Sequence, residues 1–330
     1  MSETLSKALS ARLTLITTDI AWRQWAAIGG SASSRENWTS AVDPEALILA
    51  SLYLQRNEPR ISDVLFDWVN TNSALLSAQR LKNLQKDYPQ QIGERVADFI
   101  QRIPTLSKLP RWKKIAGTQK VSDPHAFPAI SRASRPVLKS PGNLMLRLRT
   151  ALGVGVKADV LSVMLGNERP VTIRHVADCL SYTSMGVRNS LNDLAAAGFI
   201  TETRTQPASY FSAADKWRNF LDLDVLPRWT PWHHWFAFVI DLITWSDTES
   251  NKQISAYAAD VHVRKLVEKH HQFLRLSAHE LNTDTFLIGM GSSTKVLNGL
   301  VEGAEKQSQM TEFYLPAAPE ALTGTPKALP

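Results

Sequence analysis

Several side chains between residues 183 and 192 could hydrogen-bond to the edges of nucleic-acid bases. In the major groove of DNA, arginine donates two hydrogen bonds to guanine and asparagine pairs with adenine. We expect Arg188 and Asn189 to read bases, with Ser184 in support. Thr183 is placed to cap the helix that carries them, and Asn192 lies one helical turn after Arg188. Each good bidentate contact contributes about 1–3 kcal/mol of discrimination between bases.

The chain also concentrates cations before this segment. Between Arg102 and Lys157 there are twelve lysines and arginines and one acid, so this block is +11 in a chain of net charge +6. A polyanionic partner explains such a block, because each neutralised phosphate releases condensed counterions. A charged, solvated linker is the alternative. We expect phosphate or backbone contacts from Lys113, Lys114, Arg147, Arg149, Lys157 and Arg174, and from Arg204 and Gln206 at a hairpin tip.

The elements that must position these side chains follow from hydrophobic spacing. Apolar residues recur at steps of three, four and seven in three short stretches, which predicts three amphipathic helices. Their stripes are Val160, Leu161, Met164 and Leu165; Ile173, Val176, Ala177 and Leu180; and Val187, Leu191 and Leu194. Gly198 supplies a left-handed stop, and the β-prone segments 199–201 and 209–211 flank a turn at Gln206-Pro207.

This order of helices, turn and hairpin resembles the bacterial winged helix-turn-helix domain of MarR- and ArsR-like regulators, over about residues 143–213. The matching residues are Val171-Thr172, Val176-Ala177, Leu180, Ser181-Tyr182-Thr183, Val187, Leu191, Leu194 and Ala197-Gly198-Phe199-Ile200. Ser181 departs from the glycine that the family often has in the turn, which costs about 1 kcal/mol of backbone strain. The resemblance implies that helix 183–197 enters the major groove. It also implies a homodimer, paired through 143–152 and 223–245.

The rest of the chain is expected to be mainly α-helical. Residues 1–103 read as a helical bundle, 104–141 as a basic, proline-rich linker, and 142–222 as the winged helix-turn-helix with its small β-hairpin wing. Residues 223–305 read as a helical, aromatic-rich C-terminal domain, and 306–330 as a disordered tail.

Patterns of enzymes and of membrane proteins are missing from the sequence. It has no nucleophile elbow and no helical zinc signature, and residues 289–295 lack the spacing of a phosphate loop. We therefore expect no catalytic, cofactor or metal site. Glu268, His271 and His279 could build a metal site, but we expect the histidines clustered from 233 to 279 to lie on polar helix faces. A lone cysteine and no signal peptide or membrane span point to the cytoplasm.

The sequence thus predicts a DNA-binding transcriptional regulator, of the bacterial repressor kind, with double-stranded DNA as its partner. The alternative is a protein-interaction or antitoxin-like subunit that uses the same winged helix to dock a partner protein.

Overall fold

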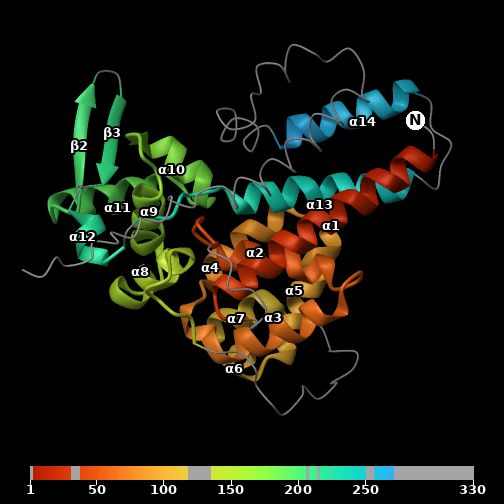
Figure 1. Ribbon diagram of the computed structural model, residues 1–330, viewed down its shortest axis with the longest axis horizontal. Helices are drawn as coiled ribbons and strands as arrows, with labels where there is room; N and C mark the ends of the chain where they lie inside the picture. The colour runs from red at the N-terminus through yellow and green to blue at the C-terminus, as the bar shows by residue number, and fades with distance from the viewer. Residues whose placement is uncertain are drawn as a thin grey trace, which may run out of the picture.

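Two hydrophobic cores organise the protein in the computed structural model, which describes residues 3–30, 38–117, 135–205, 208–213, 216–223, 225–249 and 256–270. The protein is mainly helical, as predicted, with one small antiparallel sheet. Figure 1 shows the helices of the first core gathered on one side and the hairpin projecting on the other. None of the helices within these described residues is long and apolar enough to cross a membrane.

The first core is built largely from the N-terminal half of the chain. Its helices are α1 (Glu3–Ala27), α2 (Pro44–Leu54), α3 (Pro59–Asn72), α4 (Ala78–Leu84), α5 (Gln90–Arg102), α6 (Pro104–Ser107), α7 (Pro110–Ala116) and α13 (Trp232–Glu249). Short 3₁₀ turns lie at η1 (Ser73–Leu75) and η2 (Gln85–Asp87). Helix α2 is buried along its whole length, as expected of a helix that is apolar on nearly every side.

The basic, proline-rich linker begins later than predicted. Pro104 and Pro110 start α6 and α7, because proline is favoured at the first position of a helix, where its missing N–H costs nothing. Leu106 and Trp112 from these helices are fully buried in the first core. Residues 104–116 therefore belong to the bundle, whereas 118–134 lie outside the described residues.

The prediction of a separate helical domain from residue 223 is also corrected. Helix α13 packs along α1 and α2 of the bundle (Figure 1). Trp232, Trp235 and Phe236 are buried in the first core, and the Trp232 ring lies 5.5 Å from that of Trp38. The aromatic residues do form a core, but one shared with the N-terminal bundle. Helix α14 (Ala256–Lys269) packs on α13. Residues 271–305 and the predicted tail at 306–330 lie outside the described residues.

The same burial bears on the expected dimer. Most apolar residues of α13 from Trp232 to Ile243 are covered within a single chain, whereas Val225, in the predicted segment 223–245, is 49% exposed. In 143–152, Leu144 through Leu148 are likewise covered, apart from the half-buried Arg147, whereas Leu152 is 42% exposed. The homodimer stays a prediction.

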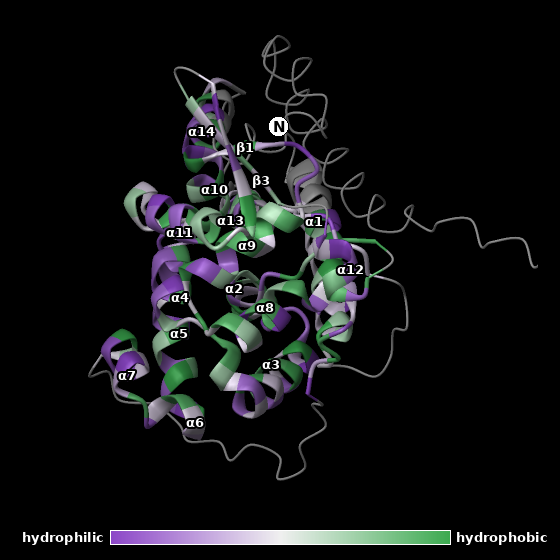
Figure 2. Cartoon of the chain, turned by 90° about the vertical axis from the view of Figure 1, so that its left-hand side faces the viewer, coloured by the Kyte–Doolittle hydropathy of each residue, from purple (hydrophilic) through white to green (hydrophobic). Residues whose placement is uncertain are grey.

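The second core contains the segment with the predicted base-reading residues. It comprises η3 (Pro141–Asn143), α8 (Leu144–Leu152), α9 (Val156–Leu165), β1 (Val171–Thr172), α10 (Ile173–Leu180), α11 (Ser184–Ala196), β2 (Ile200–Thr205), β3 (Ala208–Ala213) and α12 (Trp217–Leu221). The strands are antiparallel in the order β1-β3-β2, with Val171 opposite Phe211 and Ile200 opposite Ala213. Figure 2 shows α9, largely hydrophobic, toward the middle of the molecule.

Local sequence signals in this segment are confirmed. Val176, Leu180, Val187, Leu191 and Leu194 are all buried, as their helical spacing predicts. The Thr183 hydroxyl accepts a hydrogen bond of 3.2 Å from the Gly186 N–H, which caps α11. Ser181 has a left-handed backbone, with φ 54° and ψ 38°, so the turn does place serine in the strained conformation expected there.

Substitution of Gly198 tests whether its left-handed backbone terminates α11. Its φ is +71°, and a β-carbon added there would meet nothing within 4 Å. Gly198→Ala should therefore lower the free energy of unfolding by about 1–2 kcal/mol through backbone strain alone. Urea denaturation followed by circular dichroism measures the change.

Gly93, within α5, is the matched control, because a β-carbon there also meets nothing within 4 Å but the backbone is helical. Gly93→Ala should raise stability by about 0.5–1 kcal/mol. Equal effects of the two substitutions would contradict a left-handed stop at Gly198.

Candidate nucleic-acid interface

The exposed side of α11 brings the predicted base-reading residues together. Val187, Leu191 and Leu194 turn into the second core, which leaves the polar positions of the helix in solvent. Thr183, Ser184, Arg188, Asn189 and Asn192 are all exposed. Residues three and four apart are neighbours on a helix surface. The Arg188 guanidinium and the Asn189 and Asn192 amides can therefore reach toward one ligand.

Lys157 adds a cation beside this helix. It extends from α9 to form a 2.7 Å ion pair with Asp193 of α11, and both side chains are more than half exposed. The pair neutralises an acid on α11 itself. An approaching phosphate could compete with Asp193 for Lys157, because a surface pair of this kind contributes at most about 1 kcal/mol.

Of the two hairpin residues predicted to contact DNA, the structure describes one, Arg204. Arg204 is exposed on β2, where its guanidinium donates hydrogen bonds of 3.1 and 3.3 Å to the Glu202 carboxylate. These hydrogen bonds lower the pKa of Glu202, so the pair is ionised at neutral pH. Gln206, the other predicted tip residue, lies outside the described residues.

The remaining residues predicted to contact phosphates differ in exposure and in their distance from α11. Arg174 is exposed in the first turn of α10, with Asp178 at 3.9 Å. Arg147 is half-buried and donates a 2.5 Å hydrogen bond to the Leu221 carbonyl, so its guanidinium is used within the protein. Lys113 and Lys114 are exposed on α7, and in both views α4 lies between α7 and α11 (Figures 1 and 2). These two lysines are not brought together with the residues of α11.

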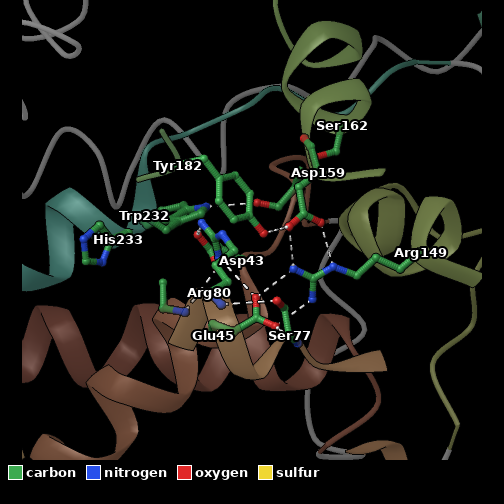
Figure 3. Close-up of polar contacts among 12 residues, drawn as sticks. Asp43, Glu45, Ser77, Arg80, Arg149, Asp159, Ser162, Tyr182, Trp232 and His233 are labelled. Atoms are coloured by element: carbon green, nitrogen blue, oxygen red, sulfur yellow. Dashed lines mark hydrogen bonds and ion pairs between the residues drawn. The ribbon is translucent and has the colours of Figure 1, made fainter. Parts of the chain in front are cut away.

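Arg149 is not available to DNA, which corrects its prediction as a phosphate contact. It is 1% exposed, and its guanidinium donates to two carboxylates from different cores. Nε donates to Asp159 Oδ1 at 2.7 Å, while Nη1 donates to Glu45 Oε1 at 2.7 Å. Its charge is therefore fully used inside the protein, as Figure 3 shows.

Arg149 belongs to a buried ion network that joins the two cores (Figure 3). We use this name for Asp43, Glu45, Arg80, Arg149, Asp159 and Tyr182. Glu45 of α2 accepts from Arg149 and from Arg80, at 2.9 and 3.1 Å. Asp43, at the start of α2, accepts from both Nη atoms of Arg80.

The network is charged despite its burial. Burial opposes the ionised form of Asp43, but Arg80 outweighs it and lowers the pKa of that carboxyl below its usual range. Desolvation also works against the Arg149 cation, yet Asp159 and Glu45 raise its pKa well above the ordinary value. Three carboxylates thus face two guanidiniums. The Tyr182 hydroxyl supplies a further donor, at 2.8 Å from Asp159 Oδ2.

Residues of the bundle that the sequence analysis did not assign lie near the turn before α11. The side-chain amide of Asn83 in α4 donates to the Ser181 carbonyl at 3.5 Å, which places α4 against that turn. Lys82, next to Asn83 in α4, and Lys86, in η2, are exposed. Only the packing of the two cores brings α4 to this turn.

A histidine pair at the start of α13 departs from the expectation of polar helix faces. His233 is fully buried and His234 is 6% exposed. With Asp87 they form a group whose ligand atoms all lie within 4.8 Å of one another. Among the described residues this is the arrangement suited to a metal ion.

The buried ion network leads to a stability prediction. Arg149→Met removes a cation that faces Glu45 and Asp159 and leaves both carboxylates buried without it. Removing one partner of a buried ion pair typically costs about 3–5 kcal/mol. We expect a loss of that size in urea denaturation monitored by tryptophan fluorescence.

Lys157→Met is the control, because its ion pair with Asp193 is exposed. Its cost should be at most about 1 kcal/mol. If Arg149→Met were as mild as Lys157→Met, the network would not hold the cores together.

The comparisons with known proteins leave the site to be interpreted from its own residues. No protein-family model, curated protein or solved structure matches the chain.

Proposed function

We propose that residues 143–213 form a winged helix-turn-helix that binds double-stranded DNA, and that the protein is a transcriptional regulator of the repressor kind. The observation that carries this proposal is the exposed side of α11. It presents one arginine and two asparagines, Arg188, Asn189 and Asn192, immediately after a turn and a capped helix start. These are the side chains that discriminate bases in the major groove.

In this proposal α11 is the recognition helix. Its first turn begins at Ser184, and Arg188 and Asn189 follow one turn later, within the half of a recognition helix that reaches base edges. The hairpin β2–β3 acts as the wing, with Arg204 directed to the DNA backbone or minor groove. Lys157 and Arg174 contact phosphates, which fixes the register of the protein on the duplex.

The bundle contributes to the same surface. Lys82 and Lys86 lie on either side of Asn83, which touches the turn before α11, so they are available to phosphates flanking the base contacts. Arg149 takes no part in DNA binding and instead sets the position of α9.

A second function is favoured by exposed apolar side chains. Met185 of α11 is 66% exposed, and Phe220 of α12 is 75% exposed. Such residues suit a partner protein, as in an antitoxin-like subunit whose winged helix docks another chain. In that case Met185 would be the anchor and the neighbouring Arg188 a contact at the rim.

Selection from a pool of randomised duplexes tests the DNA proposal. The protein should enrich one sequence and bind it about 10³-fold or more tightly than a scrambled duplex, measured by fluorescence anisotropy. Arg188→Ala should weaken binding to the selected sequence about 5- to 150-fold, since one bidentate contact is lost. Binding to the scrambled duplex should change far less.

Arg60→Ala is the matched control, because Arg60 is an exposed arginine on α3 of the bundle. It should leave both affinities unchanged. Lys157→Ala should weaken all duplexes similarly and reduce the slope of log affinity against log salt by about 1. Equal, weak binding to selected and scrambled duplexes would reject sequence-specific reading. Loss of a co-purifying protein on Met185→Asp would then favour the docking function.

A further inference from the structure

Three side chains with metal-binding chemistry meet outside the proposed DNA surface. Asp87 lies in η2 of the bundle, and His233 and His234 lie in the first turn of α13. One ligand atom from each falls within 4.8 Å of the others. In a tetrahedral zinc site with bonds of about 2.0–2.1 Å, ligand atoms are about 3.3 Å apart. Small side-chain adjustments would therefore close the group around an ion.

The hydrogen bonds already made prepare His234 to act as a ligand. Its Nε2 lies 2.7 Å from the backbone carbonyl of Asp178, which can only accept, so Nε2 carries the proton. The other nitrogen, Nδ1, is then unprotonated. An unprotonated ring nitrogen is what a metal ligand must offer.

His233 already faces Asp87. Its Nε2 forms a 2.7 Å hydrogen bond with Asp87 Oδ2, and its side chain is fully buried. An ion held by these two atoms would replace that hydrogen bond, and the proton they share would be released.

Asp87 completes the donor set and leaves it accessible. Asp87 contributes a carboxylate oxygen to the group. Its side chain is 47% exposed, so an ion can enter from solvent and keep a water as its fourth ligand.

We propose that Asp87, His233 and His234 bind one divalent transition-metal ion of the Zn²⁺ class. Two imidazole nitrogens and one carboxylate oxygen match the ligand preferences of this class, whereas Mg²⁺ and Ca²⁺ favour all-oxygen sites.

The site would connect the ion to the proposed DNA-binding segment. A ligating histidine commonly donates its other N–H to a carbonyl, which fixes the ring and its tautomer. Here that acceptor is the Asp178 carbonyl of α10, the helix before the turn. An ion bound at Nδ1 of His234 therefore favours the tautomer whose Nε2–H donates to the Asp178 carbonyl, and this hydrogen bond holds α10 against α13. Through Asp87, the same ion would also be bound to η2 of the bundle.

Titration of the full, tag-free chain with Zn²⁺ in a calorimeter tests the site without any DNA, so its outcome is separate from that of the proposed function. We expect one ion per chain. Asp87→Asn and His234→Gln should each weaken binding about 10- to 100-fold or more. Co²⁺ in place of Zn²⁺ should give visible absorption of a four- or five-coordinate ion, lost in both variants.

His262→Ala is the control, because His262 is an exposed histidine on α14. It should bind Zn²⁺ as the wild type does. Asp87→Asn keeps the test decisive if a histidine variant fails to fold, since Asp87 is half-exposed and asparagine retains a hydrogen bond to His233. Absence of stoichiometric binding by the wild type, or equal binding by the folded variants, would overturn the proposal.

Discussion

A guanidinium that is shared between carboxylates of two cores fixes how those cores sit against each other, and Arg149 occupies that position. Glu45 reaches it from the bundle and Asp159 from α9. None of these charges is exposed, so moving the cores apart would leave ions desolvated without their partners. Hydrophobic packing alone would tolerate sliding between two apolar faces. The directional hydrogen bonds of this network permit one arrangement.

The buried ion network is also connected to the start of α11. Asp159 accepts from the Tyr182 hydroxyl, and Tyr182 stands directly before Thr183, which caps α11. On the opposite side, Asn83 of the bundle contacts the Ser181 carbonyl, and His234 of α13 contacts the Asp178 carbonyl. The helix and turn before α11 are thus attached to the first core by polar contacts. These contacts fix the position of the turn before α11 relative to the bundle.

Sequence patterns were informative where the physics is local. Apolar spacing located α9, α10 and α11, and the resemblance to winged helix-turn-helix regulators pointed to Ser181 as a strained position. Patterns failed where a residue's role depends on a partner distant in the chain. Arg149 and Glu45 are 104 positions apart, so a count of cations assigned Arg149 to phosphates. Proline content alone predicts a linker from residue 104, whereas Pro104 and Pro110 stand at first helical positions and start α6 and α7.

These corrections change the electrostatic argument for a polyanionic partner. In the block of cations, Arg149 is neutralised by the buried ion network, Arg147 is bound to a carbonyl, and Lys157 is paired with Asp193. Exposed cations at 108–114 lie on α6 and α7 of the bundle or beside them, away from α11. Under the proposed function, counterion release would therefore come from the exposed cations Lys157, Arg174, Arg204, Lys82 and Lys86 and not from the whole block. Preference for one sequence would then rest mainly on the base contacts proposed for Arg188, Asn189 and Asn192.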